Sequence, residues 1–179
     1  MLSFDVSRLA PAGLSVDSVE DGEADVIIRA HPDSARDRCP DCGTWSARVH
    51  SRYLRKLNDL PIGGRRVRLV VHARRYFCDA SSCPRWTFAE RLGGTATPKA
   101  RRTRRLDDIV LCLAIALGGR PAAALAKRIE IKVSNDTLLR AVRRRGSFRP
   151  LPPSVIGIDD WAWRRNFRYG TLICDLERR

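Results

Sequence analysis

Four cysteines in two pairs are the residues whose types and spacing most clearly predict chemistry. Cys39 and Cys42 form a CxxC pair with Gly43 directly behind it, and Cys78 and Cys83 form a CxxxxC pair further along the chain. Zinc takes four thiolate or imidazole ligands in a tetrahedron, and two closely spaced cysteines can hold one ion from a tight turn. We therefore expect a structural zinc ion, because all four positions are filled and none is left for water or substrate.

Two other readings of these residues stay open. The pairs can be unrelated free thiols, or His50 or His72 can replace one cysteine as a ligand. Two pairs at ligand spacing are a stronger pattern than one, which favours the four thiolates. The remaining cysteines, Cys112 and Cys174, fall in a helical and a strand-like segment, where we expect buried apolar thiols.

The charge of the chain indicates a polyanionic partner. Lysine and arginine total 34 against 20 acidic residues, which gives a net charge of +14 and a pI of about 10.7. Nucleic acid is the simplest partner for such an excess. A GC-rich genome accounts equally well for the preference for arginine over lysine, but not for the excess itself. We see no signal peptide and no apolar run near the ~20 residues of a membrane span, so we expect a cytoplasmic protein without a membrane partner.

Helical periodicity in residues 105–149 predicts a bundle of three helices. Gly118 and Gly119 end the first helix, and Pro121 fits the first turn of the second. Ser134 predicts the N-cap of the third. The residues expected to face inward are Leu106, Ile109, Val110, Leu113 and Leu117 in the first helix, Leu125, Ala126 and Ile129 in the second, and Leu138, Leu139 and Val142 in the third.

The second and third of these helices have the proportions of a helix-turn-helix, whose later helix enters the major groove. The alternative is a solvated charged face on an ordinary bundle. Residues 93–104 form a basic linker that we expect to be flexible and to lie along the DNA backbone or in a minor groove. Arg145 and Arg149 are expected at phosphates. The predicted DNA contacts are Asn135, Thr137, Arg140, Arg143 and Arg144 in the third helix, and Arg101, Arg102, Arg104 and Arg105 before the first.

The segments before the helices read as β-structure. Residues 1–36 form an N-terminal region with a hairpin over 12–31, and residues 37–92 form a small zinc ribbon. Trp86 and Phe88 are expected in the ribbon core, with stacking on bases as the alternative. The fold class is therefore α+β and multi-domain.

A carboxylate stands at the end of an apolar strand in the last segment, residues 150–179. Asp159 and Asp160 follow Val155–Ile158, and residues 168–174 read as a hairpin partner. An acid at this place fits the opening of an RNase H-like sheet, in which several carboxylates hold two Mg²⁺ ions. A turn or cap aspartate is the alternative reading.

Several of these segments resemble the ISL-three family of insertion-sequence transposases. The zinc-binding region is carried by CPDCG, RVHSRYLRKLNDLPIGGRRVRL and RRYFCDASSCPRWTFAERL, the helix-turn-helix by SNDTLLRAVRRR, and the start of the catalytic core by IGIDDWAWRRNFRYGTLICDLERR. The resemblance implies that Cys39, Cys42, Cys78 and Cys83 are zinc ligands and that Asp159, in preference to Asp160, is the first catalytic carboxylate. It also implies binding of double-stranded DNA at terminal inverted repeats, and a bacterial cytoplasmic location at the nucleoid.

The family's core uses two Asp and one Glu, and this chain ends at Arg179 with two of these three absent. We therefore expect that the chain alone does not cleave or join DNA and that Mg²⁺ belongs only to a complete core. We also expect residues 154–179 to be poorly ordered or to pair with another copy, because strand edges and apolar side chains lack cover. The expected protein partners are a second copy or full-length transposase.

Other function classes fit less of the chain. A zinc-ribbon and helix-turn-helix transcriptional regulator would not need the Gly157–Asp160 strand or the hairpin after it. A complete metal-dependent nuclease lacks its acids, and an RNA-binding zinc protein fits poorly with a helix-turn-helix, because side chains cannot read the narrow RNA major groove.

Overall fold

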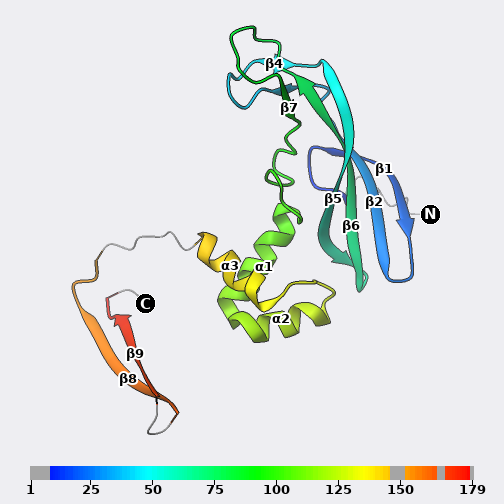
Figure 1. Cartoon of the computed structure of the whole chain (residues 1–179). Helices are drawn as coiled ribbons and strands as arrows, with labels where there is room; N and C mark the ends of the chain where they lie inside the picture. The colour runs from blue at the N-terminus through cyan, green and yellow to red at the C-terminus, as the bar shows by residue number, and fades with distance from the viewer. Residues whose placement is uncertain (1–8, 146–151, 165–167, 178–179) are drawn as a thin grey trace. The chain divides into compact units, whose positions relative to one another are not determined.

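The computed structural model describes residues 9–145, 152–164 and 168–177 (Figure 1). These residues belong to two compact units, Met1–Arg143 and Arg144–Arg179. The first unit contains a mixed sheet, the two cysteine pairs and most of the helical region. Among the described residues, no helix is both long and apolar enough to cross a membrane.

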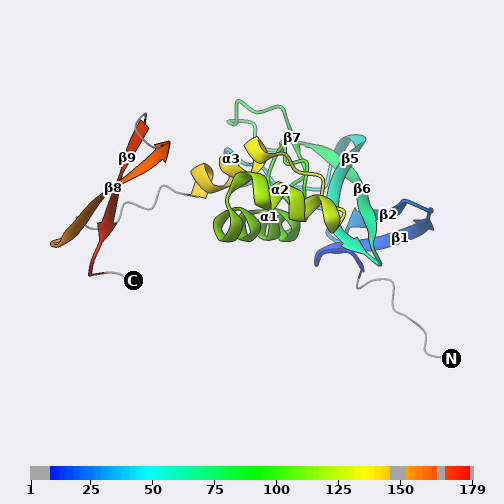
Figure 2. The ribbon, with the colours of Figure 1, turned by 90° about the horizontal axis from the view of Figure 1, so that it is seen from below.

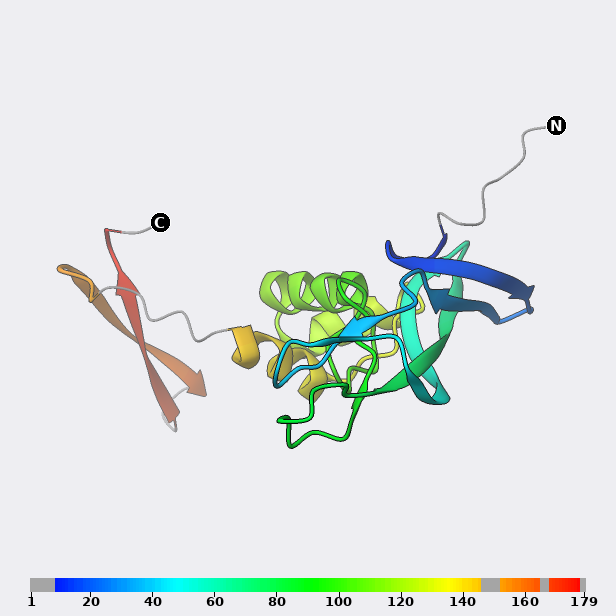
Figure 3. The same ribbon diagram turned by 90° about the horizontal axis from the view of Figure 1, so that it is seen from above.

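A five-stranded sheet forms the body of the first unit. Its order is β1-β2-β6-β5, with β7 paired to β6, and β2 runs parallel to β6 while the other pairs are antiparallel. The predicted N-terminal hairpin is therefore present, but it is part of the same sheet as the ribbon strands (Figure 3). The strands are β1 (Leu14–Asp21), β2 (Asp25–Pro32), β5 (Val49–Ile62), β6 (Arg65–Phe77) and β7 (Thr87–Ala89).

Alternation along β6 places the main core on one face of this sheet. Val67, Leu69, Val71 and Ala73 are buried, while His72 between the last two is exposed. Alternate residues of a strand point to opposite faces, so this pattern predicts one covered and one solvated face. The core cluster also includes Val26, Ile28, Ala30, Leu57, Leu92 and Ala96.

The segments that carry the two cysteine pairs lie beside β4 and β7, at one end of the long strands β5 and β6 (Figure 1). A short hairpin of β3 (Asp37–Arg38) and β4 (Trp45–Ser46) carries the first pair, and the connection from β6 to β7 carries the second. Their core cluster consists of only three buried residues, Cys39, Tyr76 and Phe88.

Three helices form the predicted bundle (Figure 2): α1 (Arg104–Leu117), α2 (Gly119–Arg128) and α3 (Asn135–Arg145). Thr103 caps α1 by accepting a hydrogen bond from the Leu106 amide. Gly118 has a φ of 74°, which favours glycine, and it ends α1 as predicted. The Ser134 hydroxyl accepts from the Thr137 amide at 3.2 Å, which confirms its predicted capping role.

The inward faces of the helices differ from the prediction at several positions. Alanines make much of the contact, and they are buried at Ala114, Ala122, Ala126 and Ala141. Small side chains let helices approach closely, and the larger neighbouring residues then lie at the rim. The residues predicted to face inward that are instead more than a third exposed are Ile109, Leu117, Leu125, Ile129 and Leu139.

The segment expected to be a flexible linker is packed against the sheet. Thr95 and Ala96 are buried, and the Arg104 amide donates to the Thr95 carbonyl at 2.7 Å. Asn58 of β5 forms a parallel bridge with Arg102. Residues 93–103 therefore connect the sheet to α1 through defined contacts, which local composition did not indicate.

The second unit contains the predicted terminal hairpin, formed by β8 (Ile156–Arg164) and β9 (Arg168–Asp175). The strands pair antiparallel with Ile158 opposite Ile173. Both isoleucines are exposed, as are Trp161 and Leu172. The segment forms a regular hairpin, and the prediction that it pairs with another copy stays a prediction.

Candidate metal centre and nucleic-acid interface

The first cysteine pair sits in a tight turn. The Cys39 amide donates to the Thr44 carbonyl at 2.9 Å, and the Gly43 amide donates to the Cys39 carbonyl at 2.9 Å. Gly43 has a φ of 74°, a conformation that a residue with a Cβ rarely adopts. This turn brings Cys42 back toward Cys39, so that both thiols face the same point.

The second cysteine pair is held by the connection between β6 and β7. The Cys78 amide donates to the Trp86 carbonyl at 2.9 Å, and the Cys83 amide donates to the Ala80 carbonyl at 3.2 Å. An ion pair of 2.7 Å between Arg85 Nε and Asp41 Oδ2 links this turn to the first one. The two turns are therefore tied together by charge as well as by their thiols.

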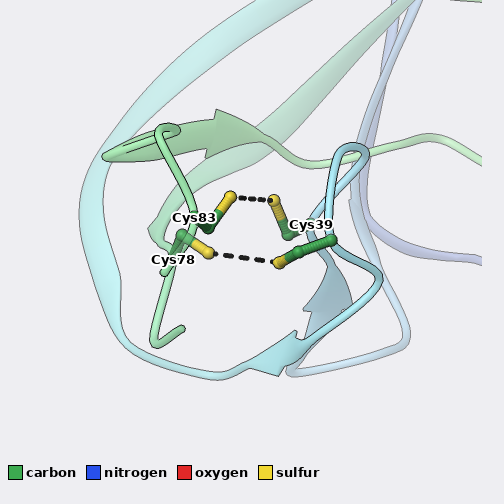
Figure 4. A group of neighbouring side chains, drawn as sticks. Cys39, Cys78 and Cys83 are labelled. Atoms are coloured by element: carbon green, nitrogen blue, oxygen red, sulfur yellow. Dashed lines mark hydrogen bonds between the residues drawn. The ribbon is translucent and has the colours of Figure 1, made fainter. Parts of the chain in front are cut away.

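The four sulfur atoms form one compact cluster. All four lie within 4.8 Å of one another, with Cys39 Sγ 3.9 Å from Cys83 Sγ and Cys42 Sγ 3.5 Å from Cys78 Sγ (Figure 4). A tetrahedron with Zn–S bonds of ~2.3 Å separates its sulfurs by about 3.8 Å. The arrangement thus fits a structural zinc site, and neither His50 nor His72 belongs to the cluster.

The electrostatics of the cluster favour a bound cation. Hydrogen bonds from Thr44 lower the pKa of Cys42 to about 6. A backbone hydrogen bond at Ala80 lowers the pKa of Cys78, but desolvation and its hydrogen bonds to the other thiols outweigh this and raise the pKa to about 12. One thiolate forms readily while its neighbour resists a second negative charge. A divalent cation removes that repulsion, because thiols that coordinate a metal lose their protons.

Beside the cluster, Trp86 projects into solvent. It is 77% exposed, whereas Phe88 is fully buried, so the prediction of core packing is confirmed for Phe88 and wrong for Trp86. The Trp86 ring meets Phe77 edge-on at 6.0 Å between centroids, and His50 meets the same Phe77 at 4.8 Å. The Arg48 guanidinium lies 4.8 Å from the Phe77 ring centroid. Aromatic rings and cations therefore share one surface.

A second exposed aromatic residue, Trp45, makes cation–π contacts that were not predicted from the sequence. Trp45 is 45% exposed, and its ring lies 4.9 Å from the Arg36 guanidinium and 4.6 Å from that of Arg38. Arg38 and Trp45 are direct partners across the β3–β4 pair. Pairing the strands on either side of the CxxC turn would have placed them together.

On α3, the predicted DNA contacts divide into two groups. Arg140, Arg143 and Arg144 are exposed, and their spacing of three and four residues places them on one side of the helix. Asn135 and Thr137 are half-buried. A Cβ on Gly119 would meet Asn135 Oδ1 at 1.8 Å, so Asn135 lies against the start of α2. The side chain of Arg145, and Arg149 as a whole, lie outside the described residues.

Of the four arginines predicted to contact DNA at or just before the start of α1, two have internal partners. Arg105 donates to the Asp59 carboxylate from Nε at 2.7 Å and from Nη2 at 2.5 Å, and Arg102 Nη2 donates to Asp107 Oδ1 at 2.6 Å. The structure thus gives these two side chains a structural role. Arg101 and Arg104 are exposed.

The candidate catalytic carboxylate lies on the terminal hairpin. Asp159 is exposed and stands opposite Leu172, and the neighbouring Asp160 accepts a hydrogen bond from Thr171 Oγ1 at 2.9 Å. In the part of the chain that the structure describes, the cysteine cluster is the only group of three or more metal-ligating side chains close enough to share an ion.

The two cysteines outside the cluster are not buried. Cys112 and Cys174 are both exposed free thiols, so the expectation for them is wrong. Cys112 lies between the buried positions Val110 and Ala114 of α1 but points away from their stripe. Cys174 belongs to the hairpin, in which most side chains are exposed.

Comparison with known proteins adds two matches. Residues 35–83, which include all four clustered cysteines, match the family described as the zinc-finger of transposase IS204/IS1001/IS1096/IS1165. The chain is 30% identical over 140 residues to "Transposase for insertion sequence element IS1001" from Bordetella parapertussis. The aligned residues cover 76% of this chain and 33% of that protein. The chain thus spans about a third of the length of this relative. No solved structure matches it.

Proposed function

Because this chain is related to the N-terminal part of the ISL-three-family insertion-sequence transposases, we propose that it binds double-stranded DNA at the terminal inverted repeats of such an element. One observation carries the proposal. The matched zinc-finger region has its four cysteine sulfurs within 4.8 Å of one another, and the exposed Arg140 and Arg143 of α3 belong to the same compact unit.

In this function the zinc ion is structural. Cys39, Cys42, Cys78 and Cys83 hold it, and it closes a region whose own core is a cluster of three buried residues. A core of that size does not hold two turns and a three-residue strand, so metal binding contributes free energy of folding there. The ion takes no part in a reaction, because the four thiolates leave it no open position.

The α3 helix is the proposed reader of base edges. Arg140 and Arg143 are exposed on it, while Leu138 is buried against the other helices. Arginine donates two parallel hydrogen bonds to guanine in the major groove. Arg101 and Arg104 are proposed phosphate contacts, and the exposed Trp86 is a further proposed contact at the ribbon.

Binding assays with element ends and random DNA test this assignment. Arg140→Ala and Arg143→Ala are each expected to weaken binding to the element end by about 1–3 kcal/mol and to leave binding to random DNA nearly unchanged. Arg52→Ala, at an exposed position of β5, removes the same charge far along the chain from α3 and serves as the control. Equal losses on both DNAs would make the α3 arginines phosphate contacts. Absence of binding at low salt would contradict the proposed function.

Asp159 is the proposed first carboxylate of an RNase H-like core that uses Mg²⁺ for strand cleavage and joining. Such a core needs several acidic ligands, and the described residues of the hairpin contain no group of three metal-ligating side chains close enough to share an ion. In a strand-transfer assay of a transposase that contains this hairpin, Asp159→Asn is expected to abolish product while Asp160→Asn retains it. The reverse result would transfer the role to Asp160.

A further inference from the structure

A buried carboxylate joins the sheet to the helices of the first unit. The Asp59 side chain, near the end of β5, is 0% exposed. It accepts hydrogen bonds from Thr103 Oγ1 at 2.7 Å, from two guanidinium nitrogens of Arg105 at 2.7 and 2.5 Å, and from the Leu60 amide at 2.8 Å. A buried charge is tolerated only where it is paired and hydrogen-bonded, and Asp59 meets both conditions through residues at the start of α1.

Backbone hydrogen bonds hold the same junction. The Asn58 amide donates to the Arg101 carbonyl at 2.9 Å, and the Thr103 amide donates to the Asn58 carbonyl at 2.9 Å. Thr103 is also the N-cap residue of α1. The first turn of the helical region is therefore attached to β5 by main chain and side chains together.

A second attachment lies between the second and third helices. Glu130, in the turn between α2 and α3, places its carboxylate 3.7 Å from Arg66 Nε on β6. The same nitrogen lies 2.9 Å from Asp25 Oδ1 on β2. Two separated attachments limit rotation of one part against the other more strongly than either one does alone.

We infer that Asp59 is a positioning residue: it fixes the helical reader relative to the zinc ribbon and its sheet, so that both contact DNA at one set separation and helical phase. This inference rests on the proposed DNA-binding function. A flexible linker would let each part find its contact independently, and the gain in affinity would then depend only weakly on the distance between them. A fixed junction makes affinity depend on where the two contacted sequences lie around the double helix.

Insertions in the DNA test this dependence. Hydroxyl-radical footprinting first locates the sequences that the ribbon and α3 protect. An insertion of 5 bp between them turns the second sequence by about half a helical turn, since one turn is 10–10.5 bp. For the unmodified protein, we expect the insertion to reduce the affinity for DNA by about 30-fold or more. For Asp59→Ala, we expect weaker binding to the original site, and we expect the insertion to reduce that affinity further by no more than about threefold. Asp33→Asn, an exposed carboxylate on the same unit, is the control and should keep the full penalty.

Arg105→Gln breaks the same ion pair from its more exposed side, where the Arg105 side chain is 35% exposed, and keeps the test available if Asp59→Ala does not fold. A second measurement needs no DNA. Trypsin cleavage at Lys99, Arg101 and Arg104 should be about tenfold faster in either variant than in the unmodified protein, because cleavage follows the population of the opened junction. An unchanged cleavage rate, or a 5-bp insertion that the unmodified protein tolerates, would overturn the inference while leaving DNA binding intact. Loss of all DNA binding in the unmodified protein would instead contradict the proposed function, and the cleavage rates would then decide the junction alone.

Discussion

Removal of zinc should release the two cysteine turns without unfolding the sheet. A metal ion that joins Cys42 to Cys78 closes a loop of 36 residues along the chain. Closing a loop of that length would stabilise the fold by about 4 kcal/mol through the entropy lost in the unfolded chain. The pairing of Val49 with Tyr76 already closes most of this loop. The path that remains covers seven positions from Cys42 to Val49 and two from Tyr76 to Cys78, nine in all.

For such a short path the same relation gives about 2–3 kcal/mol. This value is similar to what the burial of one large side chain contributes, so it is a large share of the stability of a region with three buried residues. The sheet itself keeps its larger core, including Ile28, Leu69 and Val71, in the absence of metal. The metal therefore decides the folding of the turns and contributes little to that of the sheet.

Hydrogen exchange with and without a chelator measures this difference. The amides of Cys39, Gly43 and Cys83, which donate within the turns, should exchange about 30- to 100-fold faster without zinc, since each 1.4 kcal/mol is tenfold. Amides in the paired part of β2 and β6 should change little. Cys42→Ser should lose zinc and reproduce the effect, while Cys112→Ser, an exposed thiol outside the cluster, should keep one equivalent. Equal protection of the turn amides in both states would refute the zinc assignment, and loss of protection throughout the sheet would refute the reasoning about the short path.

Three further predictions test other parts of the structure. Burial, followed by the charge of Glu90, raises the pKa of Tyr76 to about 12, above its value of about 10 in an unfolded chain. The associated stability, up to about 3 kcal/mol, is present below pH 10 and lost as the pH rises through 12. Tyr76→Phe should remove this loss when the free energy of unfolding is measured with urea at pH 9–12. The assignment would be contradicted if the free energy of unfolding of the variant fell with pH as steeply as that of the unmodified protein. Trp86→Ala should weaken DNA binding by about 1 kcal/mol or more with an unchanged melting temperature, because the side chain is largely exposed; a large drop in melting temperature would indicate a packing role. Leu138 is 0% exposed and Leu139 is 38% exposed. Leu138→Ala should therefore lower the free energy of unfolding by about 2–4 kcal/mol, and Leu139→Ala by under about 1 kcal/mol. Similar losses for the two variants would argue against this orientation of α3.

Local rules in the sequence predicted much of the candidate site. The CxxC turn with Gly43 and the second cysteine pair identified the four candidate zinc ligands, since ligand spacing and a left-handed glycine are properties of a few adjacent residues. The end of α1 at Gly118 and the start of α3 at Ser134 were predicted for the same reason, because helix capping involves residues within one turn.

Contacts between distant segments could not be predicted in this way. Periodicity identified the helices, but it predicted that Leu139 faces inward, whereas Leu139 is exposed and Ala141 is buried. The distance between packed helices decides which side chains fit between them. Composition marked residues 93–104 as a flexible basic linker, yet Thr103 donates a hydrogen bond to the Asp59 carboxylate, 44 positions earlier in the chain.

The sequence by itself determined the candidate metal ligands, the charge and the order of helices and strands, because each depends on residue types and short spacings. The tertiary structure decided which cations face solvent and which are paired within the protein. Asp59 and Arg105 come together only once β5 lies beside the start of α1, and a charge buried there must find its partner across the fold.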